Sequence, residues 1–234
     1  MSKLTVDTFR FERKFVIPPD SINYVEHIIK QNTAIFTETF YPRFVNNIYF
    51  DTQSFRFFNE NIDGVSVRKK IRIRWYGDLD GEVQNPILEF KQKSGLLGIK
   101  RYYPLDGFKL GEIFKPGFFS NLFGKSSLEL YDKDLLLSLT PTLINRYYRK
   151  YFQSVDQKFR ITLDSDLEYF PVSSPNHFQE RLLRNPFYMI MELKYDKTYQ
   201  TEASDVTQQF LFRVSKNSKY VRGVSMLYDL GEHY

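Results

Sequence analysis

The chain has 234 residues, 42% of them hydrophobic and 26% charged, with a net charge of +5, which is the composition of an ordinary globular protein. The absence of cysteine excludes a disulfide scaffold and thiolate chemistry. No apolar run approaches the ~20 residues of a membrane span, and the N-terminus lacks the apolar core of a secretory signal. We therefore expect one domain over residues 1–234, located in the cytoplasm.

In the first half of the chain, short strands and helices are predicted in turn. A strand over residues 9–17 ends at a pair of prolines. A helix with apolar residues at helical spacing follows over residues 22–30, capped by Asp20 or Ser21. A short turn or helix is predicted at residues 55–58, and a tight turn at residues 77–81. Further strands are predicted over residues 45–50, 65–76, 87–93 and 99–105.

The second half begins with a change of character over residues 106–140. Glycine and phenylalanine are frequent there, and residues 128–139 have a helical pattern, which predicts a helical insertion packed on the sheet. A helix is predicted over residues 205–213, and a strand or helix over residues 216–227. Strands are predicted over residues 145–153, 159–167 and 187–195. About eight strands with flanking helices predict an α+β fold with a mostly antiparallel sheet.

Five of these strands carry charged residues on one face, and across the set these residues are long cations with isolated carboxylates. Because successive side chains of a strand point to opposite faces, Arg72 and Arg74 share one side, as do Glu89 and Lys91. The other three patterns contain Glu12 with Lys14, Arg160 with Thr162, and Glu192 with Lys194.

Two architectures are compatible with this alternation. An open sheet would expose the charged face to water, whereas an eight-stranded β-barrel would enclose it as a charged tunnel. The opposite face is unusually bulky, as Trp75 and Phe90 illustrate, and the cations exceed what a solubilising face needs. Alternation alone favours the open sheet, whereas these two features count towards the tunnel, so both architectures stay open on this evidence.

A cavity with many cations and a few carboxylates suits linear polyphosphate bound with a divalent metal. Arginine pairs with phosphate oxygens through two hydrogen bonds, and lysine adds compact charge. Carboxylates repel bare phosphate, but Mg²⁺ and Mn²⁺ bind carboxylate and phosphate oxygens together. The alternative is that the pairs, for example Glu192 and Lys194, only neutralise one another across strands.

Eight short strings occur in the order found in one known family. They are Phe11–Phe15, Asn47–Asp51, Arg72–Gly77, Leu88–Lys91, Arg146–Arg149, Arg160–Asp164, Glu192–Lys194 and Lys216–Tyr220. Over roughly residues 9–228 the chain resembles VTC domains. These are the catalytic domains of vacuolar transporter chaperone polyphosphate polymerases, in the triphosphate tunnel metalloenzyme (CYTH-like) superfamily.

The resemblance implies a closed tunnel of eight antiparallel strands that binds a nucleoside triphosphate with Mn²⁺ or Mg²⁺. It also implies transfer of the γ-phosphoryl group of ATP to a growing polyphosphate chain. The implied catalytic cations are Arg72, Arg74, Lys91, Arg149, Arg160 and Lys219. The implied substrate-binding lysines are Lys14, Lys100, Lys194 and Lys216. The implied metal ligands are Glu192 and, more weakly, Glu12 and Glu89.

One departure bears on the reaction. The superfamily signature on the first strand is Glu-x-Glu-x-Lys, and Arg10 occupies its first position here. This points to the polymerase branch, in which the motif is relaxed. Two alternatives stay open, namely a tripolyphosphatase or nucleoside triphosphatase of the same fold and a non-catalytic module that binds polyphosphate or nucleotides.

The expected partners are ATP and inorganic polyphosphate. A nucleic-acid surface is disfavoured, because stacking platforms need aromatic and basic residues on one face and the alternation separates them. No membrane span of its own is expected, whereas a membrane-protein partner and the oligomeric state stay open.

Overall fold

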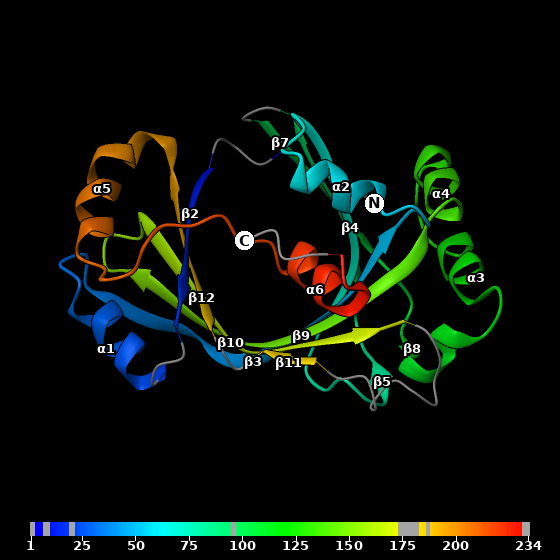
Figure 1. The fold of residues 1–234 in the computed structure, drawn as a ribbon, viewed down its shortest axis with the longest axis horizontal. Helices are drawn as coiled ribbons and strands as arrows, with labels where there is room; N and C mark the ends of the chain where they lie inside the picture. Colours follow the sequence, from blue (N-terminus) through cyan, green and yellow to red (C-terminus); the bar gives the residue numbers. More distant parts are fainter. Residues whose placement is uncertain are drawn as a thin grey trace.

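The computed structural model describes residues 3–6, 10–18, 22–94, 97–172, 183–185 and 188–230 (Figure 1). Nine strands of the main antiparallel sheet follow one another in the order β1-β7-β6-β4-β3-β9-β10-β12-β2, and β11 pairs with β10. The strands of this sheet are β1 (Lys3–Val6), β2 (Arg10–Ile17), β3 (Phe36–Asp51), β4 (Val67–Tyr76), β6 (Ile87–Ser94), β7 (Leu97–Pro104), β9 (Thr140–Ser154), β10 (Phe159–Pro171), β11 (Leu183–Asn185) and β12 (Met189–Asp196). A separate two-stranded sheet pairs β5 (Glu82–Val83) with β8 (Phe108–Lys109).

The two edges of the main sheet are formed by consecutive strands. β1 pairs with β7 at one edge, and β2 pairs with β12 at the other. Nine flat strands would separate their edges by roughly 38 Å at about 4.8 Å per strand. Because β1 ends at Val6 and β2 begins at Arg10, the chain limits the separation of these two residues to ~15 Å, at about 3.8 Å per residue. The sheet therefore curls back on itself, as Figure 1 shows.

The predicted α+β class and antiparallel sheet are confirmed, but the predicted closed barrel is corrected. Within the described strands, β1 and β2 end the path and do not pair with each other. The path also has nine strands rather than eight, because β1 precedes the first predicted strand. The fold is a curled sheet with an interior and an exterior face.

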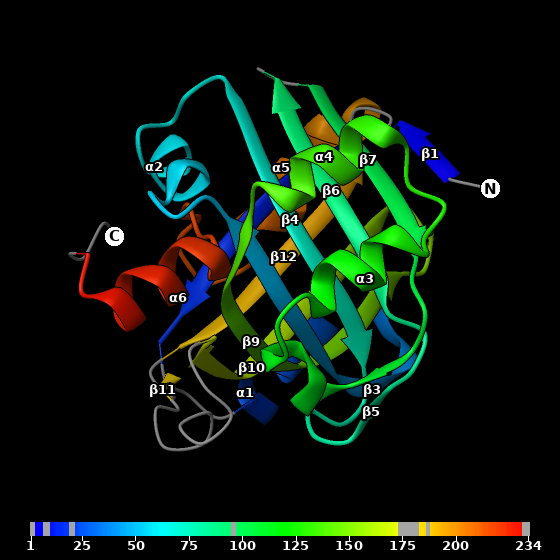
Figure 2. The ribbon, with the colours of Figure 1, turned by 90° about the vertical axis from the view of Figure 1, so that its right-hand side faces the viewer.

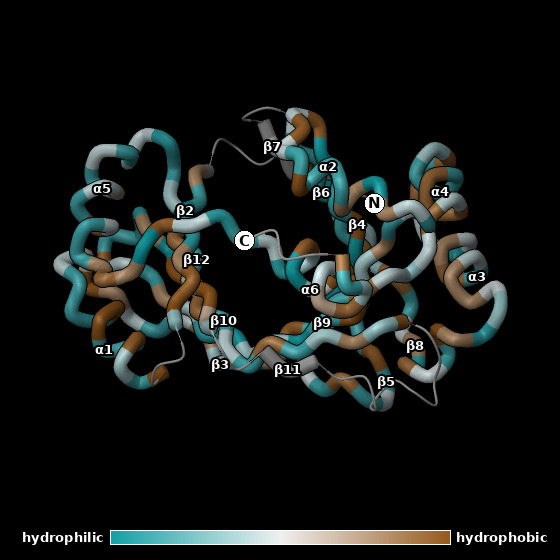
Figure 3. Tube along the Cα trace, viewed as in Figure 1, coloured by the Kyte–Doolittle hydropathy of each residue, from teal (hydrophilic) through white to brown (hydrophobic). Residues whose placement is uncertain are grey.

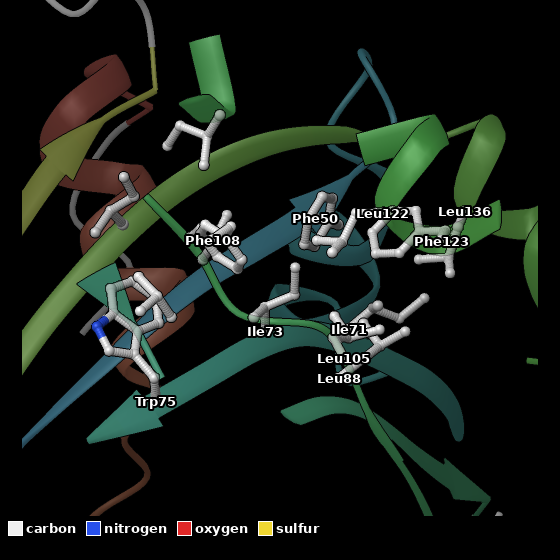
Figure 4. Packing of buried hydrophobic residues seen from close by; sticks show 14 of the residues in the cluster. Phe50, Ile71, Ile73, Trp75, Leu88, Leu105, Phe108, Leu122, Phe123 and Leu136 are labelled. Atoms are coloured by element: carbon white, nitrogen blue, oxygen red, sulfur yellow. The ribbon is translucent and has the colours of Figure 1, made fainter. Parts of the chain in front are cut away.

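Helices cover the exterior face in two groups, and one group lies in front of β4, β6 and β7 in Figure 2. The helical elements are α1 (Ile22–Gln31), α2 (Arg56–Ile62), η1 (Leu110–Phe114), α3 (Phe118–Gly124), α4 (Leu130–Leu137), η3 (Lys197–Tyr199), α5 (Gln200–Gln208) and α6 (Lys219–Tyr228). α1 and α5 pack with the buried residues of β2, β10 and β12. η1, α3 and α4 pack on β4, β6 and β7 around Trp75 and Phe123 (Figure 4).

The C-terminal helix α6 packs on the interior face instead. Its Tyr220 and Val224 share a core cluster with Tyr49 and Tyr147. Tyr49 is directly opposite Arg72 across strands, so α6 covers the same face that carries the arginines. Gly223 permits this close approach, because a Cβ atom there would lie 2.6 Å from the ring of Tyr169. α6 thus brings its first turn into the curl (Figure 1).

Alternation along the strands separates the two faces. In β4, Ile71, Ile73 and Trp75 are buried in the exterior core, while Arg72 and Arg74 between them are only partly buried. Alternating hydrophilic and hydrophobic residues can be followed along the strands in Figure 3. A period of two residues is the pattern that a strand with two different faces requires.

Most predicted elements lie where the sequence placed them, with three differences. β3 begins at Phe36, earlier than the predicted strand at residues 45–50, and its first half contains register shifts. The predicted helix at residues 205–213 is α5, which begins and ends earlier. Residues 216–227 resolve into helix α6. The proposed cap residues Asp20 and Ser21 lie outside the described residues.

No helix in the described ranges has both the length and the apolar character that crossing a membrane requires.

Candidate functional site

The interior face collects the charged residues predicted from the alternation. Strand register places Arg72 opposite Glu89, Lys14 opposite Glu192, and Lys91 opposite Lys100. Arg160 is opposite Lys194. Lys219 reaches the same interior from the first turn of α6, and Lys216 lies in the segment before that helix. Two groups of strands contribute to the face, which we call the β2–β12 wall (β2, β12, β10 and β9) and the β4–β6 wall (β3, β4, β6 and β7).

Glu192 is the centre of charge on the β2–β12 wall. Its carboxylate lies 2.8 Å from the Nζ of Lys194, 3.5 Å from that of Lys14 and 3.8 Å from that of Lys219. The residue is buried, which would raise its pKa, but the three lysines and Arg149 hold that pKa well below its usual range. Glu192 is therefore a carboxylate held ionised by cations from four elements, namely β12, β2, α6 and β9.

Glu12 lies beside Glu192 on the neighbouring strand. Both carboxylates contact the same ammonium group, because Lys14 Nζ is also 3.0 Å from Glu12 Oε1. Burial and the charge of Glu192 raise the pKa of Glu12, but Lys14, Lys194 and Lys91 outweigh them and lower it to about 2. Lys14 of this wall and Lys70 of the β4–β6 wall contact the adjacent residues Asn217 and Ser218, so the two walls face each other across the interior.

Asp164 links the wall to α6 and was not among the predicted site residues. Arg149 donates two hydrogen bonds to it, at 2.5 and 2.7 Å, and Lys219 Nζ lies 2.5 Å away. The Asp164 side chain is fully buried, which would raise its pKa, but these two cations lower the pKa below the usual value. The signal was present in the sequence, since Arg160, Thr162 and Asp164 alternate along one strand face.

On the β4–β6 wall, the predicted metal ligand Glu89 is paired with two arginines. Arg72 donates to it at 2.7 Å through Nε, and a terminal nitrogen of Arg74 lies 3.2 Å away. Arg72 also donates to the hydroxyl of Tyr49, and Arg74 donates to Asn47. Glu89 therefore neutralises and orients the two arginines.

A row of three lysines crosses the β4–β6 wall without an intervening carboxylate. Lys70, Lys91 and Lys100 are directly opposite one another on adjacent strands, an arrangement that like charges normally disfavour. Loss of hydration inside the protein lowers the pKa of Lys91 to about 8; Glu12 opposes this, whereas Lys14, Lys100 and Lys194 add to it. Burial and the neighbouring cations likewise lower the pKa of Lys70. A bound polyanion would relieve this concentration of positive charge.

Sequence patterns did not single out two further polar contacts around α6. Lys70 donates to the hydroxyl of Ser218, which caps the first turn of α6, at 2.7 Å. The backbone carbonyl of Asn217 accepts from Lys14 at 3.0 Å. Because these contacts join segments about 150 and 200 residues apart, strand alternation alone could not reveal them.

Two predicted cations are peripheral to these networks. Arg160 and Lys216 are exposed, and neither forms an ion pair with another residue that the structure describes. Arg160 is two residues before Thr162 on the same face of β10, and it lies opposite Lys194. Their side chains are thus available to a ligand without first breaking a salt bridge.

Several buried polar atoms on or beside the interior face also lack a partner. Among the described residues, Thr162 Oγ1, Asn145 Nδ2 and Asn217 Nδ2 are inaccessible and make no hydrogen bond. Buried polar groups are normally hydrogen-bonded, so each such atom calls for an explanation. A polar ligand in the interior, or water that accompanies it, would supply these hydrogen bonds.

A divalent metal fits this interior only together with a phosphate ligand. Glu12 and Glu192 bracket one cationic position, which the ammonium of Lys14 takes here. One or two carboxylates completed by substrate phosphate oxygens are the usual ligands of Mg²⁺. No group of three or more His, Cys, Asp or Glu side chains in the described part of the chain is placed to bind a metal. Glu192 with Glu12 is therefore the pair that would hold the ion.

The geometry defines an antiparallel sheet curled around a cationic, carboxylate-containing interior. A family model described as the VTC domain matches residues 9–228, and the chain belongs to this family. Membership relates the fold to nucleotide or polyphosphate chemistry and to enzymes. A search of curated proteins finds no match.

Three solved structures are similar to this chain at low sequence identity. One is a candidate adenylate cyclase from Bacillus halodurans, with a TM-score of 0.55 and 13% identity over 92% of this chain and 97% of that one. A Pyrococcus horikoshii protein has a TM-score of 0.48 and 13% identity over 94% and 99% of the two chains. A candidate adenylate cyclase from Vibrio parahaemolyticus has a TM-score of 0.49 and 14% identity over 92% and 98%. At 13% identity, the similarity to the Bacillus halodurans structure shows that the fold is shared and nothing about function.

Proposed function

We propose that this protein is an ATP-dependent polyphosphate polymerase. The observation that carries the proposal is that cations from two facing walls and from α6 converge on one interior, in a chain of the VTC family. A linear chain of phosphates is long enough to contact both walls at once, and its charge complements the row of Lys70, Lys91 and Lys100 on the β4–β6 wall. A small anion would occupy only part of this surface.

In the proposed reaction, a terminal oxygen of the polyphosphate chain attacks the γ-phosphorus of ATP. The bond from that phosphorus to the β–γ bridging oxygen breaks, ADP leaves, and the chain is longer by one phosphate. Phosphoryl transfer depends mainly on positioning and on neutralising charge, so no protein nucleophile is required. A Mn²⁺ or Mg²⁺ ion held by Glu192 and Glu12, with Glu89 a weaker candidate, would neutralise charge on the phosphates.

The cations have different proposed roles, which depend on their positions. Arg149, Arg72 and Arg74 are oriented by Asp164 and Glu89, so their donors are fixed before the ligand binds. Lys219 would bind the transferred group from the side of α6. We assign Lys91 and Arg160 to the same reacting phosphates. The remaining lysines of the proposed site would hold the rest of the chain; they are Lys14, Lys100, Lys194 and Lys216.

Incubation with ATP and Mn²⁺ tests the proposal. Polyphosphate longer than any phosphate supplied should accumulate on a gel, with one ADP released for each phosphate added, and a chelator should stop both. Release of orthophosphate without chain growth would mean that the protein is instead a triphosphatase of the same fold. If neither ADP nor longer chains form, the protein is not a polymerase but a module that only binds polyphosphate or nucleotides.

The lowered pKa of Lys91 predicts that polyphosphate binding depends on pH. With a pKa of about 8 in the free protein, Lys91 is charged at pH 7 and mostly neutral at pH 9. A bound polyanion favours the charged form, so this contribution to affinity is present below pH 8 and each binding event takes up a proton above it. The affinity for tripolyphosphate, relative to Lys91→Arg at the same pH, should fall by up to about 10-fold between pH 7 and 9.

Calorimetry at pH 7, 8 and 9 provides this measurement. The arginine variant stays charged throughout, and comparing the two proteins at each pH cancels the titration of the ligand itself. A constant ratio of affinities across the range would show that Lys91 does not titrate in the site.

A further inference from the structure

Three side chains form an aromatic and guanidinium cluster at the margin of the interior face. The guanidinium of Arg43 lies 3.9 Å from the ring centroid of Tyr76 and 5.3 Å from that of Tyr151. Its Nε donates to the Tyr151 hydroxyl at 3.2 Å, and Phe40 packs edge-on against Tyr151 at 5.7 Å. The cluster joins β3, β4 and β9, and Tyr76 is 42% exposed.

The cluster is next to the proposed phosphate-binding cations. Arg43 is directly opposite Arg149 across β3 and β9, and Tyr76 is two residues beyond Arg74 on the same face of β4. Tyr151 is close enough to Arg149 for that cation to influence its pKa, which burial raises and the arginines lower in part. A ligand whose phosphates lie against Arg149 and Arg74 therefore extends towards these rings.

Chemistry separates this cluster from the rest of the interior. In the proposed phosphate site, carboxylates neutralise the arginines. Arg43, in contrast, makes no ion pair with a described carboxylate and stacks on aromatic rings instead. Flat aromatic and guanidinium surfaces stack on nucleobases whatever the base. A polyphosphate chain has no group that uses such a surface, but a nucleoside triphosphate has.

We propose that Tyr76, Arg43 and Tyr151 bind the base of the nucleotide whose phosphates lie in the interior. This assignment rests on the proposed function, since it requires a nucleoside triphosphate as the phosphate donor. It gives the site its preference for a nucleotide over a bare phosphate chain at the donor position. The preference is for a base in general, so ATP and GTP should bind within a few-fold of each other.

Calorimetric binding of ATP and of tripolyphosphate to matched variants tests the assignment. Tyr76→Ala should weaken ATP binding by about 10-fold, because stacking on an aromatic side chain is worth ~1–3 kcal/mol per base. The same variant should bind tripolyphosphate within about twofold of the wild type, since it keeps the phosphate-binding cations. Tyr76→Phe should restore ATP binding, because the ring remains.

Tyr41→Ala is the matched control. Tyr41 lies on the same strand as Arg43 but is 94% exposed and outside the cluster, so its removal should change neither affinity. Equal losses of ATP and tripolyphosphate affinity in Tyr76→Ala, or no loss of ATP affinity, would overturn the base assignment while leaving polymerisation by the wild type intact. If the wild type binds neither ligand, the proposed function fails and the assignment fails with it.

Discussion

Replacing Glu192 by glutamine should reduce ATP-dependent chain growth by about 100-fold or more, because charge stabilisation by a catalytic metal is worth several kcal/mol. The substitution keeps the shape of the side chain and removes the carboxylate that Lys14, Lys194 and Lys219 surround. Those lysines stay in place, so the affinity for tripolyphosphate without metal should be unchanged or higher. This variant should therefore lose turnover and keep its affinity for tripolyphosphate in the absence of metal.

Initial rates at several Mn²⁺ concentrations, together with calorimetry in a chelator, provide the measurement. Glu60→Gln is the control, since Glu60 lies on α2 and pairs only with Arg56 among its described neighbours. Wild-type turnover in Glu192→Gln would remove Glu192 from the metal site. A parallel loss of turnover and of tripolyphosphate binding would show that the residue only organises the lysines.

Replacing Asp164 by asparagine should be the most destabilising change in the interior. Asp164 is fully buried between Arg149 and Lys219. Without its charge, Arg149 loses the carboxylate that it hydrogen-bonds, and Lys219 keeps only Glu192, 3.8 Å away. Breaking a buried ion pair in this way typically costs about 3–5 kcal/mol. For a chain of this length, the loss corresponds to a fall in Tm of roughly 10 °C. Thermal unfolding followed by circular dichroism measures it.

Ligand binding should partly reverse that loss. Tripolyphosphate supplies anionic oxygens to the same cations, so at saturating concentration it should raise the Tm of Asp164→Asn by more degrees than that of the wild type. Asp63→Asn, at the exposed end of α2, should behave as the wild type in both measurements. A variant as stable as the wild type would mean that the Arg149 and Lys219 contacts do not stabilise the fold.

The sequence predicted the interior face well because that prediction needed only local information. Arg72 with Arg74, and Glu89 with Lys91, alternate with residues of the exterior core, and a strand has no other way to satisfy such a pattern. The antiparallel α+β class followed from the same pattern. The family resemblance then assigned roles to polar residues of this face, and those roles stay predictions.

What the sequence did not predict depends on contacts between distant segments. The first half of β3 is polar, contains Pro42 and has irregular register, so it lacks the alternation of a strand. The position of α6 on the interior face depends on Gly223 fitting against Leu143 and Tyr169, and the pattern of α6 alone cannot show that. Asp164 alternates with Arg160 and Thr162 on one strand face, but its second partner, Lys219, comes from α6, so β10 alone does not show that it lies between two cations.

A second set of long-range contacts fixes α6 in place. Asp51 is buried at the end of β3, where it accepts hydrogen bonds from the backbone of Phe57 and Phe58 and from the hydroxyl of Tyr220. It thereby joins β3, α2 and α6 through one carboxylate. The position of Lys219 in the interior is a consequence of this junction, because Lys219 directly precedes Tyr220 in the helix.

A crystal structure with a non-hydrolysable ATP analogue and Mn²⁺ would show directly where the triphosphate binds. We expect a triphosphate inside the curl that contacts Arg149 and Lys14 on one wall and Arg72 and Lys91 on the other, with the ion on Glu192. A triphosphate bound on the exterior face, or one that contacts a single wall without Glu192 near the ion, would contradict it.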